Sequence, residues 1–299
     1  MNKKHIVLFL CFIFFLTFSS SGNASGTGGS YGAVFDNDGT AEYFSIGRNF
    51  DPFGNCASSA YSQPSGIAGV EKTTIGFTVS KPFAEVDGLK HGNFDVIIPL
   101  KKIKLGLAYS NFSVSDIREA EAGVLTNVTF DASFSMLRAT AGTKLFNKLP
   151  VAAQVKLATN KIQYYSNRNI ALDLGAGYYI DDFYVGAKVN NLFCTEDAFK
   201  TQKEKLPFGF ELACAYAVIA GDFNIYAAFS AEEYRRSDFR FGAKYQLFNN
   251  FSLQAGYIGE SQTLAGGVTL KILKSEFQYG VNSHTDLGLS HKISIIICF

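Results

Sequence analysis

From about residue 73 to the end of the chain, one segment after another alternates between apolar side chains and polar or small ones. Between Ile170 and Ile180, one phase carries Ile170, Leu172 and Leu174, while the other carries Asp173 among small and polar residues. Successive side chains of a β-strand point to opposite faces of the sheet. The pattern therefore predicts strands with one continuously apolar face and one polar face.

The charged residues inside these predicted strands nearly all lie on the polar phase. They are Lys156, Glu211, Arg240, Lys244, Lys271, Glu276 and Lys292. A soluble sheet would bury the apolar face and expose the charges to water, whereas a barrel in a membrane turns its apolar face to lipid and its polar face to the lumen. The connections between the strands distinguish the two cases.

About fourteen strands can be counted, and their connections alternate in length. Short connections such as 181–182 and 249–250 alternate with longer or more polar ones such as 113–127 and 194–206. An even strand number, with short turns at one end and longer loops at the other, is typical of bacterial outer-membrane barrels, whose short turns face the periplasm. We therefore expect an all-β protein, an antiparallel transmembrane β-barrel of about 14 strands in the outer membrane, in contact with its lipid.

One expected strand, residues 128–146, breaks the alternation. Its apolar phase changes parity near Met136 and Leu137. A β-bulge adds one residue to a strand and would have this effect. The alternative is that two strands have been counted as one.

The N-terminal part of the chain has a different composition. Residues 1–24 combine a basic start, a short apolar run and small residues, which predicts a secretory signal peptide. Residues 25–72 lack the alternation, and a barrel of about fourteen strands has a lumen that must be filled or left open. We expect 25–72 to form an N-terminal plug, with a loose periplasmic tail as the alternative, and 73–299 to form the barrel.

Three charges from consecutive expected strands share the inward phase. These are Lys156, Asp173 and Lys188, which become neighbours if the hairpins pair in register. They could form a charge network that satisfies the lumen and anchors the plug. Alternatively, they could form a polar step on a transport route.

Catalysis is not expected. After the predicted signal peptide the histidines are His91, His284 and His291, and the adjacent Ser290 and His291 must point to opposite faces of one strand. No clustered metal ligands are found, so neither a metal nor another cofactor is expected. The net charge of +1, without a basic stripe, argues against a nucleic-acid partner.

Several short motifs occur in an order that is similar to one family. The segment Gln63, Pro64, Ser65 and Gly66, followed by Ile67 and Ala68, resembles the Asn-Pro-Ala-Gly-Leu-Ala segment of PorV/PorQ-like outer-membrane proteins, relatives of the FadL-type transporters. Leu172–Gly175 and Leu287–Ser294 add to the resemblance, which extends from about residue 40 to the end. Gln63 departs from the family's usual Asn. The resemblance implies a fourteen-stranded barrel with an N-terminal plug.

The same resemblance implies two alternative functions. PorV-like proteins are components of type IX protein secretion, whose partners are secretion-machinery subunits or secreted proteins. FadL-type relatives move hydrophobic small molecules across the outer membrane. We expect a secretion component, with transport of hydrophobic compounds as the alternative.

Overall fold

The structure is a computed structural model that describes residues 33–54, 57–121, 124–146, 148–199, 202–219, 221–284 and 287–299. The predicted signal peptide, 1–24, lies outside the described residues. None of the helices in these ranges has the length and hydropathy of a membrane-spanning helix.

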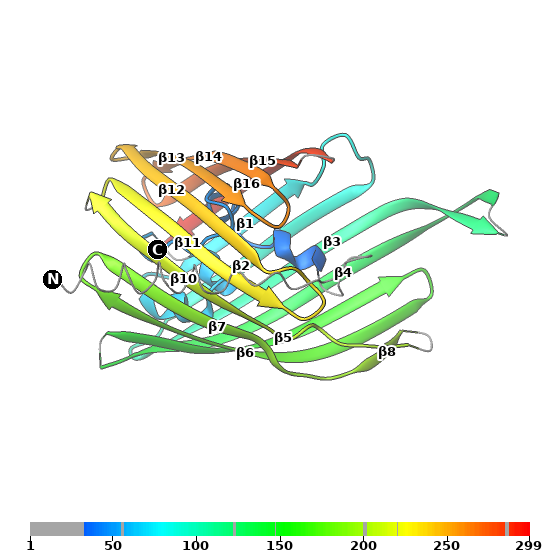
Figure 1. Ribbon diagram of the computed structural model, residues 1–299, viewed down its shortest axis with the longest axis horizontal. Coiled ribbons are helices and arrows are strands. Elements are labelled where there is room, and N and C mark those ends of the chain that lie inside the picture. The colour runs from blue at the N-terminus through cyan, green and yellow to red at the C-terminus, as the bar shows by residue number, and fades with distance from the viewer. Residues whose placement is uncertain are drawn as a thin grey trace.

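Fourteen antiparallel strands close into a barrel, as the sequence predicted (Figure 1). Each strand pairs with its neighbours along the chain, and the first strand pairs with the last to close the ring. The barrel strands are β1 (Thr74–Lys81), β2 (Leu89–Pro99), β3 (Ile103–Glu121), β4 (Val124–Leu145), β5 (Leu149–Ile162), β6 (Tyr165–Ile180), β7 (Phe183–Cys194), β10 (Gly209–Ile219), β11 (Phe223–Glu232), β12 (Asp238–Phe248), β13 (Phe251–Ile258), β14 (Thr263–Ile272), β15 (Ser275–His284) and β16 (Gly288–Cys298).

The two faces of the wall differ as the alternation predicted. On β16, Ile293 is 52% exposed on the outside while its neighbour Lys292 is buried inside. On β6, Leu174 faces outward and Asp173 is buried in the lumen. The apolar outer face can meet lipid because every strand in a closed barrel has its backbone hydrogen bonds satisfied by neighbours.

The two ends of the barrel also differ. Tight turns such as residues 181–182 and 249–250 form one end, on the left in Figure 1, and we call it the narrow-turn end. Longer connections form the opposite end, the long-loop end. One of them, between β7 and β10, contains a small separate hairpin, β8 (Asp197–Phe199) and β9 (Gln202–Glu204).

The prediction of a loop at 113–127 is wrong. Strands β3 and β4 continue through most of it as a two-stranded ribbon, which projects beyond the other connections in Figure 1. A bulge at Ser115 and Asp116 separates the ribbon from the barrel wall, because the pairing shifts between Val114 and Ile117. The sequence did not predict this extension, because adjacent apolar side chains such as Val124 and Leu125 are both exposed and the apolar and polar residues do not alternate there.

The expected irregularity near Met136 is also wrong. β4 is a single strand, and its register with both β3 and β5 is continuous past Met136. The inward phase becomes apolar there because Met136 packs in a luminal cluster with Ala158 and Leu206, to which Phe35 adds its ring. The chemistry of the inner face changes at this point, and the register of the strand does not.

The described part of the predicted plug, residues 33–54 and 57–72, lies against the inner face of the wall. We call it the N-terminal segment. It contains the short helices η1 (Ala33–Asn37), α2 (Ala41–Ser45), η2 (Ala57–Ala60) and η3 (Pro64–Gly69). Helix α2 contacts β13 to β16, η2 contacts β1 to β3, and η3 contacts β3 to β6. Contacts to opposite sides of the ring place residues 38–54 and 57–72 inside the barrel. Whether they block passage stays a prediction.

Candidate functional site

Helix α2 is fixed to the wall through its first turn. The backbone N–H of Ala41 donates to Ser294 Oγ at 2.8 Å, and that of Glu42 donates to Gln278 Oε1 at 3.2 Å. Thr40 caps the same turn by accepting from Tyr43 N. The first N–H groups of a helix have no partner within the helix. Here β15 and β16 supply partners, so the wall determines where α2 sits.

A buried lysine joins two acidic residues of the N-terminal segment. Lys244 Nζ, on β12, lies 2.9 Å from Glu42 Oε2 and 3.0 Å from Asp51 Oδ2. All three side chains are buried. Removing one member of such a group leaves an uncompensated buried charge, which is strongly destabilising. Lys244 therefore ties residues 42–51 to the wall.

Asp38 is the centre of a second buried cluster. It accepts hydrogen bonds from His91 Nε2 at 2.9 Å and Ser110 Oγ at 2.7 Å, and it pairs with the Arg138 guanidinium. Burial alone would raise the pKa of Asp38, but Arg138 and His91 outweigh it and hold that pKa below its usual value. Asp38 is therefore ionised at neutral pH.

His91 in turn contacts Ser80, whose Oγ lies 2.9 Å from His91 Nδ1. Ser80, His91 and Asp38 thus form a chain of hydrogen bonds that the sequence did not predict. Arg138 occupies the far side of Asp38, and neither Ser80 nor His91 lines the cavity described below. The chain therefore serves as a link between β1, β2 and the N-terminal segment.

The predicted plug motif lies at the start of η3, against β6 and β7. Gln63 Nε2 donates to the carbonyls of Ala176 and Ala187, each at 3.2 Å. Ser65 Oγ lies 3.4 Å from Tyr184 OH. A side chain at Gly66 would collide with the Phe50 ring, because an added Cβ would lie 2.2 Å from it. The motif therefore combines a polar contact to the wall with close packing, and Pro64 begins the helix.

The structure brings together two of the three predicted lumen charges directly. Lys156 Nζ lies 2.7 Å from Asp173 Oδ1, and both side chains are buried. Lys188 instead donates to the backbone carbonyl of Ser62 at 2.6 Å and lies 3.8 Å from Glu211. The pairing places Lys188 opposite Gly175 of β6 and opposite Glu211 of β10, so Glu211 is its nearer carboxylate.

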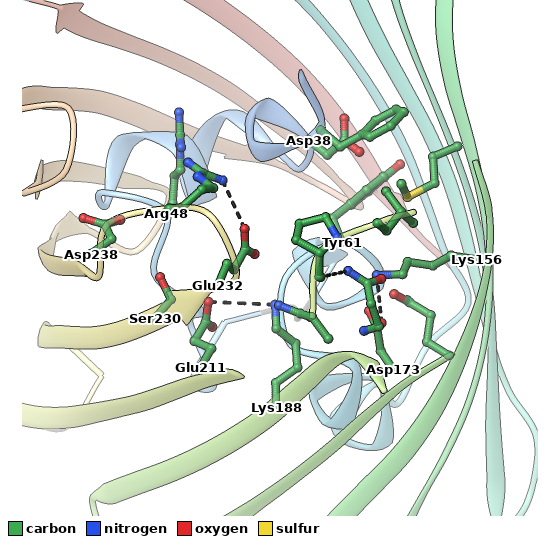
Figure 2. Close-up of a pocket in the computed structure, with 18 of the residues that line it drawn as sticks. Asp38, Arg48, Tyr61, Lys156, Asp173, Lys188, Glu211, Ser230, Glu232 and Asp238 are labelled. Carbon is green, nitrogen blue, oxygen red and sulfur yellow. Dashed lines mark hydrogen bonds and ion pairs between the residues drawn. The ribbon is translucent and has the colours of Figure 1, made fainter. Parts of the chain in front are cut away.

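A cavity of about 140 Å³ remains between the N-terminal segment and the wall at the long-loop end. Figure 2 shows Lys188 and Glu211 extending into it from the wall and facing each other, with Lys156 and Asp173 at the other side. Arg240 pairs with Glu211 and donates to the Arg48 carbonyl. The lining is therefore dominated by charged side chains that bind one another.

The outer rim of the cavity carries a further ion-pair group. Arg235 lies 2.7 Å from Glu260 and 3.2 Å from Glu232. The pair with Glu260 joins the connection between β11 and β12 to the connection between β13 and β14. These side chains are only partly buried. Sequence reasoning missed this group because the loops that bring the residues together have no periodic pattern.

The described residues provide no arrangement for metal-dependent chemistry. Among them there is no group of three or more His, Cys, Asp or Glu side chains that could hold a metal ion. Ser290 faces inward and accepts from Phe83 N, whereas His291 faces outward and contacts the Tyr279 hydroxyl, as the strand pattern predicted. Asp286, next to His284 in the expected loop, lies outside the described residues.

The sequence matches the model of a known protein family. The model of the family described as type IX secretion system membrane protein PorP/SprF matches residues 123–297, more than half of the chain. No curated protein sequence matches the chain significantly.

Solved structures share the fold at low sequence identity. The monoaromatic hydrocarbon channel CymD has a TM-score of 0.65 at 10% identity, over 87% of this chain and 97% of that one. The toluene transporter TbuX of Ralstonia pickettii has a TM-score of 0.61 at 12% identity, over 87% and 97%. A FadL homologue of Pseudomonas aeruginosa has a TM-score of 0.61 at 9% identity, over 87% and 98%. These similarities show that the chain shares the barrel fold of these proteins, and a shared fold does not determine function.

Proposed function

Because the chain belongs to the family of type IX secretion system membrane proteins PorP/SprF, we propose that it is a non-enzymatic component of protein secretion across the outer membrane. Its partners are then subunits of the secretion machinery or the secreted proteins themselves. In this role the barrel acts through surfaces that bind proteins, and its lumen carries no cargo.

The observation that best supports this role is the charged lining of the interior. The N-terminal segment is held by Lys244, by the Asp38 cluster and by the first turn of α2. The remaining cavity is lined by paired charges such as Lys156 and Asp173. We propose that residues 25–72 act as a fixed plug and that Lys156, Asp173 and Lys188 anchor it.

The finer resemblance to PorV/PorQ belongs to the same proposal. The matching segment, Gln63 to Gly66, contacts β6 and β7, and on this proposal it fastens the plug to these two strands. On this hypothesis the outer loops carry secreted proteins, and the connection with β8 and β9 is a candidate contact surface.

Transport of hydrophobic small molecules is the alternative function. The FadL-like fold favours it, since the similar structures include a toluene transporter and a hydrocarbon channel. Hydrophobic ligands, however, bind in pockets lined mainly by apolar and aromatic side chains. The cavity beside Lys188 and Glu211 has the opposite chemistry, so the alternative is less well supported.

The test is to lock the N-terminal segment to the wall. Ala41 N lies 2.8 Å from Ser294 Oγ, so Ala41→Cys with Ser294→Cys places two thiols close together. The gene is deleted in its native bacterium and replaced by this variant, and the secreted proteins are quantified by mass spectrometry together with uptake of labelled oleate. The same variant kept reduced is the matched control.

We expect deletion to abolish secretion and the oxidised, locked variant to restore it, because a fixed plug does not need to move. Normal secretion in the deletion strain would contradict the proposal. Loss of oleate uptake in both the deletion strain and the locked variant, with secretion intact, would favour the transporter.

A further inference from the structure

The narrow-turn end carries a groove that the proposed function does not use. Two hollows, of about 530 and 420 Å³, lie at this mouth of the barrel. Both are lined by Gly69 and Lys144, so they adjoin, and together we call them the groove. Its lining comes from the C-terminal end of η3 and from the turns β2–β3, β4–β5 and β6–β7.

The lining of this groove contains five lysines and only two acidic residues. Three lysines come from the β2–β3 connection and the start of β3, and two come from the end of β4 and the turn after it: Lys101, Lys102, Lys104, Lys144 and Lys148. The acidic residues are Glu71 and Asp181. Within the described ranges, none of the five lysines forms an ion pair. Concentrated like charge opposes compact folding through self-repulsion.

Three buried lysines of the same chain are arranged differently. Lys156 and Lys244 each contact a carboxylate within 3 Å, and Lys188 contacts a carbonyl and a more distant carboxylate. Lys104, in contrast, donates only to the carbonyl of Leu100, at 3.3 Å. The positive charge at the narrow-turn mouth is therefore not needed to hold the described structure together, and it remains available to an anionic partner.

We propose that this groove binds an acidic polypeptide segment of a partner protein. The placement of its lysines favours an acidic chain over a lipid headgroup, because Lys104 and Lys144 lie on the inward phase of their strands, beside Ala68 and Gly69 of the N-terminal segment. These two lysines therefore face the aqueous mouth. Tyr178 and Ile180 lie on the outward phase of β6 and add apolar surface at the edge of the groove.

The chain's own N-terminal residues cannot supply the acidic groups. None of the first 32 residues is Asp or Glu. The occupant is therefore a different molecule, and because short turns face the periplasm in such barrels, it is expected to be periplasmic. This inference concerns the binding chemistry of one mouth and does not require the secretion role.

The test measures binding of a fluorescein-labelled decaglutamate peptide to the purified full-length barrel by fluorescence anisotropy. The test variant carries Lys101→Glu, Lys102→Glu and Lys144→Glu. The matched control carries Lys90→Glu, Lys161→Glu and Lys203→Glu, which makes the same change in net charge at exposed lysines of the long-loop end. Heat-dependent gel mobility establishes that both variants are folded.

We expect the groove variant to weaken binding by at least about tenfold, and the control variant by less than about twofold, because a local charge patch and not the net charge attracts the peptide. Equal weakening in both variants would overturn the proposal, as would failure of the wild-type barrel to bind. Displacement of the peptide by dihexanoyl-phosphatidylglycerol at equal concentration would assign the groove to lipid headgroups, which also overturns it.

Discussion

The two mouths of the barrel both carry many charges but use them differently. At the long-loop end, cations and carboxylates are paired: Lys156 with Asp173 at 2.7 Å, and Arg235 with Glu260 at 2.7 Å. At the narrow-turn end, the groove has lysines such as Lys101 and Lys144 that form no ion pair with a described residue. Paired charges in the interior are structural, because removing one partner leaves the other buried and uncompensated. Unpaired charges at a mouth contribute little to stability and are free to bind.

The largest expected effect is at the buried pair of the long-loop end. Asp173→Ala leaves Lys156 buried without its carboxylate and should lower the free energy of unfolding by about 3–5 kcal/mol. The measurement is urea unfolding of the barrel in lipid vesicles. The control is Asp173→Leu with Lys156→Met, which removes both charges and should recover most of the loss. A loss below about 1 kcal/mol for Asp173→Ala would mean that the pair is not structural.

The next effect depends on pH. Asp38 has a lowered pKa in the folded state, so its contribution to stability is present above its ordinary pKa of 3.8 and is lost as the pH falls through the folded-state pKa. Asp38→Asn should therefore cost about 2 kcal/mol at pH 7, as expected for a hydrogen-bonded charge. The difference between the two proteins should shrink below pH 3.8. Unfolding curves at several pH values provide the measurement, and a difference that does not vary with pH would contradict the prediction.

A smaller effect is expected at the rim of the same end. Arg235 is partly exposed to solvent, so Arg235→Ala should lower the free energy of unfolding by less than about 1 kcal/mol, because partly exposed ion pairs are screened. The cost should decrease further in high salt. Unfolding in low and high salt tests this. A salt-independent loss of several kcal/mol would show that the rim pairs behave like the buried ones.

The smallest effect is expected at the narrow-turn end. Lys101→Glu with Lys144→Glu should change the free energy of unfolding by no more than about 0.5 kcal/mol, because neither lysine has an ionic partner to lose. The same unfolding assay provides the measurement, with Asp173→Ala as the reference for a structural charge. Destabilisation by more than about 2 kcal/mol would remove the distinction between the two mouths.

The barrel could be predicted from the sequence because lipid and lumen impose opposite demands on alternate residues. That requirement is local, so strands such as β6 and β16 can be recognised without knowing their partners. It fails where the environment changes. Met136 is inward but apolar because Leu206 and Phe35 cover it, and the β3–β4 ribbon stands outside the wall, where neither face is buried.

The site was less predictable because its contacts join distant parts of the chain. Lys156 and Asp173 lie on adjacent strands, so their pairing follows from phase and register alone. Lys188 contacts Ser62 and Glu211 because it lies opposite Glu211 of β10 and beside the N-terminal segment, and neither neighbour follows from the pattern of β5 to β7 alone. His91 was missed because its partner, Asp38, belongs to a segment without periodicity.

The pairing of β1 with β16 has a consequence for how the molecule is made. This seam joins the beginning of the wall to its end, Thr74 to Cys298, so the cylinder cannot shut until the final residues have been synthesised and exported. The residues that precede β1 touch strands on both sides of the seam, including β2 and β15. Because these residues contact strands on both sides of the seam, we expect their packing and the pairing of β16 with β1 to be completed together, late in the assembly of the protein.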